Sequence, residues 1–175
     1  MLRVFCLGGL GITVEDVYLI DPDPDRGGHE RGVRVELRLL PLQPWRGTRN
    51  AAQPIVADRA VWRADFLESV AGGPGSKDRM HHHPGMVDSE PGRRVFVPGL
   101  TADPMGWLKH QLFDVLPLLE AAGVDADAHR ASAEEIRDAI PEIVGTVATV
   151  LGEVREGILA TSPTAGRTAG TRPAS

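Results

Sequence analysis

The period at which apolar side chains recur changes from two in the first half of this chain to a helical spacing in the second. Apolar and charged residues alternate most regularly between positions 33 and 39, where the apolar members are Val33, Val35, Leu37 and Leu39. Such alternation places the apolar side chains on one face of a strand and the charged ones on the other. Strands of this kind are typical of an antiparallel sheet with one face on the core. We therefore expect such a sheet in the N-terminal half.

Further strands are indicated on both sides of this one. Apolar runs cover residues 14–20 and 94–97, and a longer amphipathic segment covers residues 55–67. Aromatic and small apolar residues alternate with charged ones in the longer segment, which suits a pleated surface. A Gly- and Pro-rich connection over residues 71–92 separates it from the last strand. The count of strands is therefore about four or five.

The second half has the pattern of two helices. Asp103 before Pro104 is a helix start, and Pro117 is expected to kink or split the helix that follows. Ser132 and Glu135 have the spacing of a capping box at the start of a second helix. Its apolar stripe runs from Ile136 to Ile158, and Pro141 is expected to kink it. The fold class predicted is α+β, in which two long, kinked C-terminal helices cover an antiparallel sheet.

The length of 175 residues fits one domain, which we place at residues 13–160. Residues 1–12 carry a short apolar run interrupted by glycines, and we expect them to form a poorly ordered leader. Residues 161–175 consist of small residues, prolines and arginines, so we expect a disordered tail.

Charge and cysteine content exclude several classes of protein. The net charge of −5 argues against a nucleic-acid-binding protein, which usually has a basic surplus. A transmembrane helix needs about 20 apolar residues, and no run of that length occurs. Cys6 is the single cysteine, so no intrachain disulfide forms and a cytoplasmic location is favoured.

Three consecutive histidines, at positions 81–83, are the strongest chemical feature of the chain. In an extended segment His81 and His83 point to the same side, which gives two ligands for a divalent transition metal. Asp78 and Asp88 are the candidates that complete this site, and Asp65 and Glu90 are further carboxylates that could contribute. The alternative is a solvated loop whose histidines contact backbone groups or a partner.

The spacing from Gly75 through the two histidines to Asp88 partly resembles the first metal motif of the cupin family. Asp88 stands where that motif has glutamate, and Val95 stands where it has its closing glycine. We do not assign the chain to that family.

A second candidate site lies in the segment Trp62–Asp65. If Arg63 and Asp65 faced a cavity next to Trp62, they could bind a polar ligand. The interpretation we favour is a charge pair on the solvated face of a sheet.

Two functions from different classes follow. We favour a non-catalytic binding or assembly module, in which the helix over residues 136–158 provides the contact between copies in a homo-oligomer. The alternative is a metal-binding protein or small metal-dependent enzyme that uses His81 and His83. The sequence identifies neither a catalytic residue nor the small molecule or protein that binds, and both functions stay open at this point.

Overall fold

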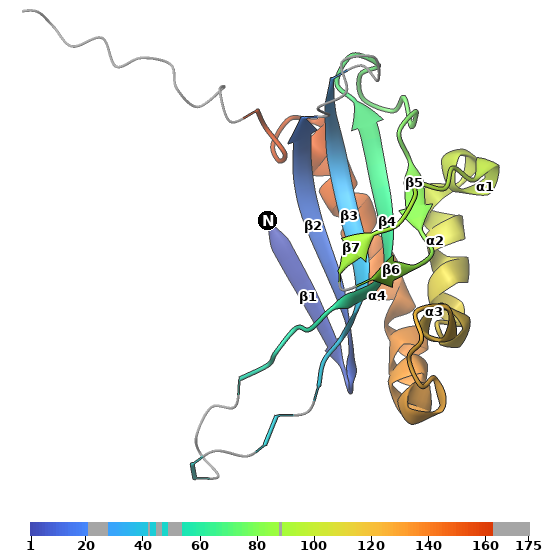
Figure 1. Cartoon of the computed structure of the whole chain (residues 1–175). Coiled ribbons are helices and arrows are strands. Elements are labelled where there is room, and N and C mark those ends of the chain that lie inside the picture. Colours follow the sequence, from blue (N-terminus) through green and yellow to red (C-terminus); the bar gives the residue numbers. More distant parts are fainter. Residues whose placement is uncertain (21–27, 42, 45–46, 49–53, 88, 163–175) are drawn as a thin grey trace, which may run out of the picture.

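The main element of the protein is a five-stranded antiparallel sheet with strand order β1-β2-β3-β4-β5 (Figure 1). The computed structural model describes residues 1–20, 28–41, 43–44, 47–48, 54–87 and 89–162. The strands are β1 (Leu2–Leu7), β2 (Leu10–Ile20), β3 (His29–Leu39), β4 (Ala60–Ser69) and β5 (His81–His83). Each strand pairs with the next one along the chain, so the sheet is a simple meander. The expected antiparallel sheet in the N-terminal half is confirmed.

Helices follow the sheet in the sequence and cover one of its faces. They are α1 (Pro98–Ala102), α2 (Pro104–Phe113), α3 (Leu116–Ala121), the 3-10 turn η2 (Asp127–His129) and α4 (Arg130–Arg155). The 26-residue helix α4 packs on β1, β2 and β3 and on α2 (Figure 1). The α+β class is therefore confirmed, with a single long helix on the sheet.

Strand register explains which side chains face α4. Val35 lies opposite Ala64, and Leu37 lies opposite Trp62, all on the helix-covered face. The apolar alternation in β3 thus continues across to β4, and both sets of side chains are buried. The apolar stripe of α4 packs into the same core. Its buried residues are Ile136, Ile140, Ile143, Val147, Val150, Leu151 and Val154.

The opposite face of the sheet carries charged side chains, and a small hairpin covers part of it. Strands β6 (Met86–Val87) and β7 (Glu90–Pro91) form this hairpin, which lies in front of β3 and β4 in Figure 1. Acidic residues on this face, such as Glu36 and Asp65, are 4% and 2% exposed. These charged residues therefore form a buried polar layer. The expectation that they lie on a solvated face of the sheet is wrong.

The N-terminal segment differs from the expectation for a structural reason. Residues 1–12 hold β1 and the start of β2, so they belong to the sheet and do not form a poorly ordered leader. Gly8 and Gly9 form the two-residue turn between the strands, and Gly8 has a φ of +60°. Two glycines between apolar runs are a hairpin signal because they tolerate positive φ.

The helix predictions are met in part. Asp103 caps α2 as expected, since its side chain accepts a hydrogen bond from the Gly106 backbone. Pro117 lies in the first turn of α3, so the first predicted helix is split into two short ones. Pro141 lies inside α4 without ending it, and the kink there stays a prediction. The predicted capping box is wrong, because α4 begins at Arg130 and Ser132 accepts a hydrogen bond from Gly9 of the β1–β2 turn.

The segment around the histidines also differs from the prediction. The connection over residues 71–92 contains strand β5, made of the three histidines, and the β6–β7 hairpin. Residues 94–97 do not form a strand, although Val95 makes two backbone hydrogen bonds to His82. Residues 163–175 of the expected disordered tail lie outside the described residues. In the part of the chain that the structure describes, no helix is long and apolar enough to cross a membrane.

Packing of α4 on the sheet predicts a position-specific loss of stability. We expect Ile143→Ala to lower the free energy of unfolding by about 2–5 kcal/mol, because it leaves a cavity between α4 and the sheet. The neighbouring exposed substitution Glu142→Ala is the control and should change it by less than about 0.5 kcal/mol. Urea unfolding followed by circular dichroism measures both values. Equal effects of the two substitutions would contradict the packing described.

Candidate metal centre

Three side chains from two neighbouring strands meet on the polar face of the sheet. β5 pairs with β4 so that His81 lies opposite Asp65 and His83 lies opposite Arg63. Because side chains alternate along a strand, His81 and His83 share the face of Asp65, and His82 points to the other face. One potential ligand atom each from Asp65, His81 and His83 lies within 4.8 Å of the other two. We call these residues the Asp65–His81–His83 cluster.

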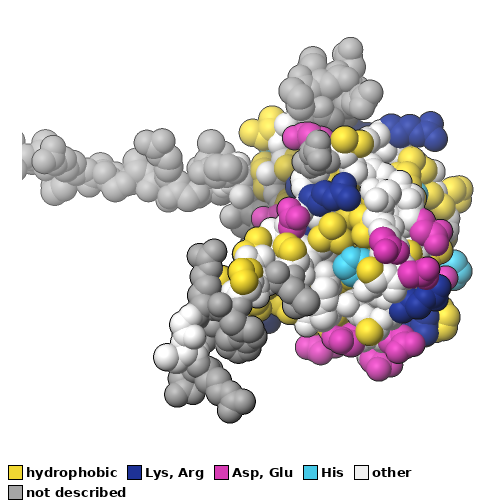
Figure 2. All heavy atoms as spheres, turned by 60° about the horizontal axis from the view of Figure 1, so that its bottom comes forward, with side chains coloured by type: hydrophobic (Ala, Val, Ile, Leu, Met, Phe, Trp, Pro, Cys, Tyr) yellow, Lys and Arg dark blue, Asp and Glu magenta, His cyan; other side chains and the backbone are white. Residues whose placement is uncertain are grey.

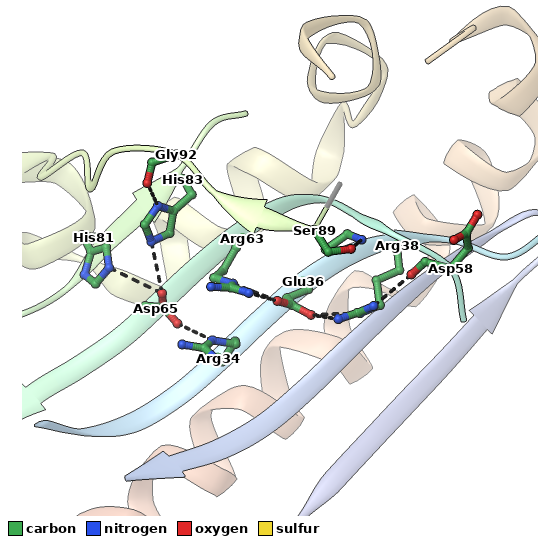
Figure 3. A network of polar contacts seen from close by, with 11 residues as sticks. Arg34, Glu36, Arg38, Asp58, Arg63, Asp65, His81, His83, Ser89 and Gly92 are labelled. Carbon is green, nitrogen blue, oxygen red and sulfur yellow. Dashed lines mark hydrogen bonds and ion pairs between the residues drawn. The ribbon is translucent and has the colours of Figure 1, made fainter. Parts of the chain in front are cut away.

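Both imidazole rings of the cluster are oriented by backbone carbonyl groups. His81 Nδ1 lies 2.7 Å from the Arg79 carbonyl oxygen, and His83 Nδ1 lies 2.8 Å from that of Gly92 (Figure 3). A carbonyl oxygen only accepts hydrogen bonds, so Nδ1 carries the proton in both rings. Nε2 of each ring then remains available as a ligand atom. Metal-binding histidines in proteins are usually oriented in this way.

Both Nε2 atoms face the same carboxylate oxygen. Asp65 Oδ2 is 3.4 Å from His81 Nε2 and 3.4 Å from His83 Nε2. A charge-assisted N–H···O bond is shorter, about 2.7–2.9 Å. Around a tetrahedral zinc ion with bonds of about 2.0–2.1 Å, two ligand atoms lie about 3.3–3.4 Å apart. The two separations between Asp65 Oδ2 and the histidine nitrogens therefore match edges of a metal coordination tetrahedron.

Asp65 is held as a carboxylate in this buried place. Burial alone would raise its pKa, but the contacts of Asp65 with the His81 and His83 imidazoles and with the Arg34 guanidinium outweigh burial and hold the pKa well below its usual range. Arg34 Nε donates to Oδ1 over 2.9 Å, so the second oxygen, Oδ2, is the one directed to the histidines (Figure 3). The Asp65 carboxylate thus contacts an arginine of β3 through one oxygen and the imidazoles of β5 through the other.

A group of ion pairs lies beside the cluster on the same face. Glu36 lies between two arginines, with Oε1 accepting from Arg63 Nε over 2.8 Å and Oε2 accepting from Arg38 Nε over 2.8 Å. Figure 3 shows this group next to the cluster along β3 and β4. The guanidinium of Arg63 is therefore committed to Glu36 and does not enter the cluster.

The second site considered from sequence is divided between two faces of the sheet. Trp62 is fully buried on the core face, where it stacks on Trp107 with ring centroids 6.0 Å apart. Arg63 and Asp65 lie on the opposite face. The structure therefore does not bring Trp62, Arg63 and Asp65 to one common site, and it places Asp65 with the histidines.

Of the acidic residues expected to complete the metal site, Asp78 lies in the turn between β4 and β5. Its carboxylate accepts hydrogen bonds from the Ser69 backbone, the Ser69 hydroxyl and the Ser76 hydroxyl. It is not a member of the cluster. Asp88 lies outside the described residues.

Arg34 is the part of the site that sequence analysis did not identify. It belongs to the charged half of the alternating strand, but nothing in its local sequence separates it from Arg38. Only the pairing of β3 with β4 places it opposite Asp65. Identifying Arg34 from the sequence would require the register between β3 and β4.

Comparison with known proteins gives no relative of this chain: no family of proteins, no curated protein and no solved structure matches it.

The hydrogen bonds of Asp78 predict a pH-dependent contribution to stability. Burial would raise the pKa of Asp78, but the bonds from Ser69 and Ser76 outweigh it and lower the pKa from 3.8 to about 2. A carboxyl with a lowered pKa stabilises the fold above its unfolded-state value and loses that effect as the pH falls through the folded-state value. We therefore expect Asp78→Asn to be less stable than the unmodified chain at pH 7, with the difference shrinking between pH 3.8 and about 2.

Urea unfolding at a series of pH values checks this expectation. Asp138→Asn, at an exposed position of α4, is the control. A difference between Asp78→Asn and the unmodified chain that is independent of pH would contradict it.

Proposed function

We propose that this protein binds one divalent transition metal ion through Asp65, His81 and His83. The observation that carries the proposal is the common orientation of the two imidazoles. In each ring, Nδ1 donates a hydrogen bond to a backbone carbonyl oxygen, and Nε2 lies 3.4 Å from the same oxygen of Asp65. Without a cation between them, the lone pairs of the two Nε2 atoms would face an anionic oxygen, which is repulsive.

Zinc fits this set of ligands best. Two imidazole nitrogens and one carboxylate oxygen are ligands that zinc accepts, and the tetrahedral edge agrees with the observed separations. Three protein ligands leave one of the four positions for a water molecule or a ligand oxygen. A zinc ion supplies Lewis acidity at that position, lowering the pKa of a bound water or polarising a carbonyl group.

A proton is the competing occupant of the cluster. If one imidazole carried a second proton, its Nε2–H group would donate to Asp65 Oδ2 and shorten that one distance. The two distances are instead the same, 3.4 Å each. A cation shared by both rings accounts for equal distances, so the geometry favours the metal ion over the proton.

The apolar stripe of α4, which we expected to join copies in the assembly module, packs within the chain. Its residues from Ile136 to Val154 are buried against the sheet. Ile158 is exposed but lies beyond the end of the helix. Homo-oligomer formation stays a prediction, as does the cytoplasmic location, which rests on the single Cys6.

Metal binding is tested first by direct titration. We expect untagged, chelator-treated protein to bind one equivalent of zinc, and His81→Gln or His83→Gln to weaken binding by more than about 100-fold. Changes around metal ligands already cost about 10–100-fold, so loss of a ligand should exceed that. Isothermal titration calorimetry gives the stoichiometry and affinity, and visible absorption of the cobalt(II) form reports tetrahedral coordination.

His82→Gln is the matched control for this titration. His82 is on the same strand, but its ring faces the core, 5.2 Å from that of Trp107. We expect its zinc affinity to be unchanged. Absence of zinc binding by the unmodified protein, or equal weakening in all three histidine variants, would sink the proposal. Circular dichroism of each variant establishes that it is folded.

Zinc should also stabilise the fold, because the cluster is assembled only when β4 and β5 are paired. At a free zinc concentration of 100 times the dissociation constant, the expected gain in the free energy of unfolding is about 2.7 kcal/mol. Urea unfolding with and without zinc measures the gain, which should vanish in His83→Gln. An equal gain in this variant would show that zinc acts elsewhere on the chain.

A further inference from the structure

A cavity with a basic lining lies next to the cluster. Its volume is about 580 Å³, and Arg79, Arg93, Arg94 and Phe96 line it. Two of these residues touch the cluster through His81. The Arg79 carbonyl oxygen accepts from His81 Nδ1, and the Phe96 ring centroid is 5.5 Å from that of His81. We call this space the arginine cavity.

Two carboxylates among the described residues form ion pairs with arginines of the cavity. Glu30, which is 2% exposed, lies 3.1 Å from Arg94 Nη1 and 3.6 Å from Arg79 Nε, both measured from Oε1. Asp78 Oδ2 lies 3.9 Å from Arg79 Nε. Arg93 makes no ion pair with another described residue. Within the described part of the chain, three guanidinium groups therefore line the cavity, and the carboxylates of Glu30 and Asp78 pair with two of them.

This group of arginines contrasts with the net charge of the chain. The chain has a net charge of −5, and acidic side chains gather along the lower edge of the face shown in Figure 2. The buried Glu30 carboxylate also holds Arg79 and Arg94 side by side, so their orientation is fixed before any ligand arrives.

We propose that the arginine cavity binds a small organic anion whose carboxylate or phosphate group pairs with the arginines and whose apolar part packs on Phe96. Arginine presents a planar fork of donors that matches both kinds of anionic group. Phe96 is 56% exposed and offers an apolar surface in the lining of the same cavity. The volume is within the range of about 300–1,000 Å³ that is usual for small-molecule sites. This binding goes beyond the proposed metal function and does not require the metal ion.

The test uses four defined ligands with the full chain. Benzoate and phenyl phosphate carry the two anionic groups on an aromatic ring, benzamide is the neutral counterpart, and inorganic phosphate lacks the ring. We expect saturable binding of benzoate or phenyl phosphate, with the tighter of the two identifying the anionic group. Benzamide and inorganic phosphate should bind more weakly, each by about tenfold or more. Calorimetry or ligand-observed NMR measures all four.

Arg93→Gln is the main variant, because Arg93 is exposed and its loss leaves the buried Glu30 pairs in place. It should weaken binding of the anion by about tenfold or more, the usual worth of a charge-assisted bond. Phe96→Ala should weaken benzoate or phenyl phosphate but not inorganic phosphate. Arg137→Gln is the matched control, since Arg137 lies 4.8 Å above the Phe113 ring, away from the cavity residues.

Each result decides the proposal. It is overturned if neither aromatic anion binds saturably, if benzamide binds as tightly, or if Arg93→Gln and Arg137→Gln have the same effect. The titrations are repeated with zinc and with His83→Gln, which separates the two sites. Anion binding that persists in zinc-free His83→Gln supports the arginine cavity whether or not the cluster binds zinc. Zinc binding without anion binding overturns the anion site and leaves the metal proposal intact.

Discussion

The buried carboxylate of Asp65 is the interaction around which the polar face of the sheet is built. A charge that is 2% exposed is unstable in a protein unless groups of opposite charge or hydrogen-bond donors surround it. Arg34 supplies one such partner from β3, and the cation proposed between Asp65 Oδ2 and the imidazoles of His81 and His83 would supply the opposite charge on the β5 side. The three strands must keep one register for these contacts to exist, so the carboxylate and the strand pairing depend on each other.

The same rule governs the other buried carboxylates of the sheet. Glu36 is paired with arginines of β3 and β4, and Glu30 with arginines that lie after β4 and after β7. Glu68 pairs with Arg155 at the end of α4. Removing one member of such a pair leaves an uncompensated charge, which costs more than the pair contributes. These buried pairs therefore constrain how the connection before β5, the segment after β7 and the last helix meet the sheet.

Period-two and helical patterns made the sheet and α4 predictable from sequence, because both depend on local spacing. The apolar members of residues 33–39 are on the core face, and the apolar stripe of α4 packs against them. The apolar stripe of α4 does not by itself indicate which surface the helix packs on. An apolar helix face fits a second copy as well as a sheet of the same chain, and only the whole fold distinguishes the two.

The candidate site was predictable only in part, for a related reason. Alternation along an extended segment places His81 and His83 on one side, and this follows from the sequence. The sequence does not show that Asp65, and not the nearer Asp78, lies beside these histidines. That arrangement depends on strand pairing across a turn of eleven residues, from Val70 to Met80. Asp78 carries the same chemical group but is used by Ser69 and Ser76. Sequence distance to the histidines was therefore a poor guide to the ligand.

Strand β5 explains why the cluster can be rigid although it lies at the edge of the sheet. Only three residues long, this strand pairs with β4 on one side and, through His82 and Val95, with the following segment on the other. Each imidazole of the cluster is further fixed by a backbone carbonyl. Ligand atoms held in this way lose little freedom when an ion binds, so more of the coordination energy is expressed as affinity. The neighbouring His82 contributes by facing the core against Trp107, which fixes the strand from its other face.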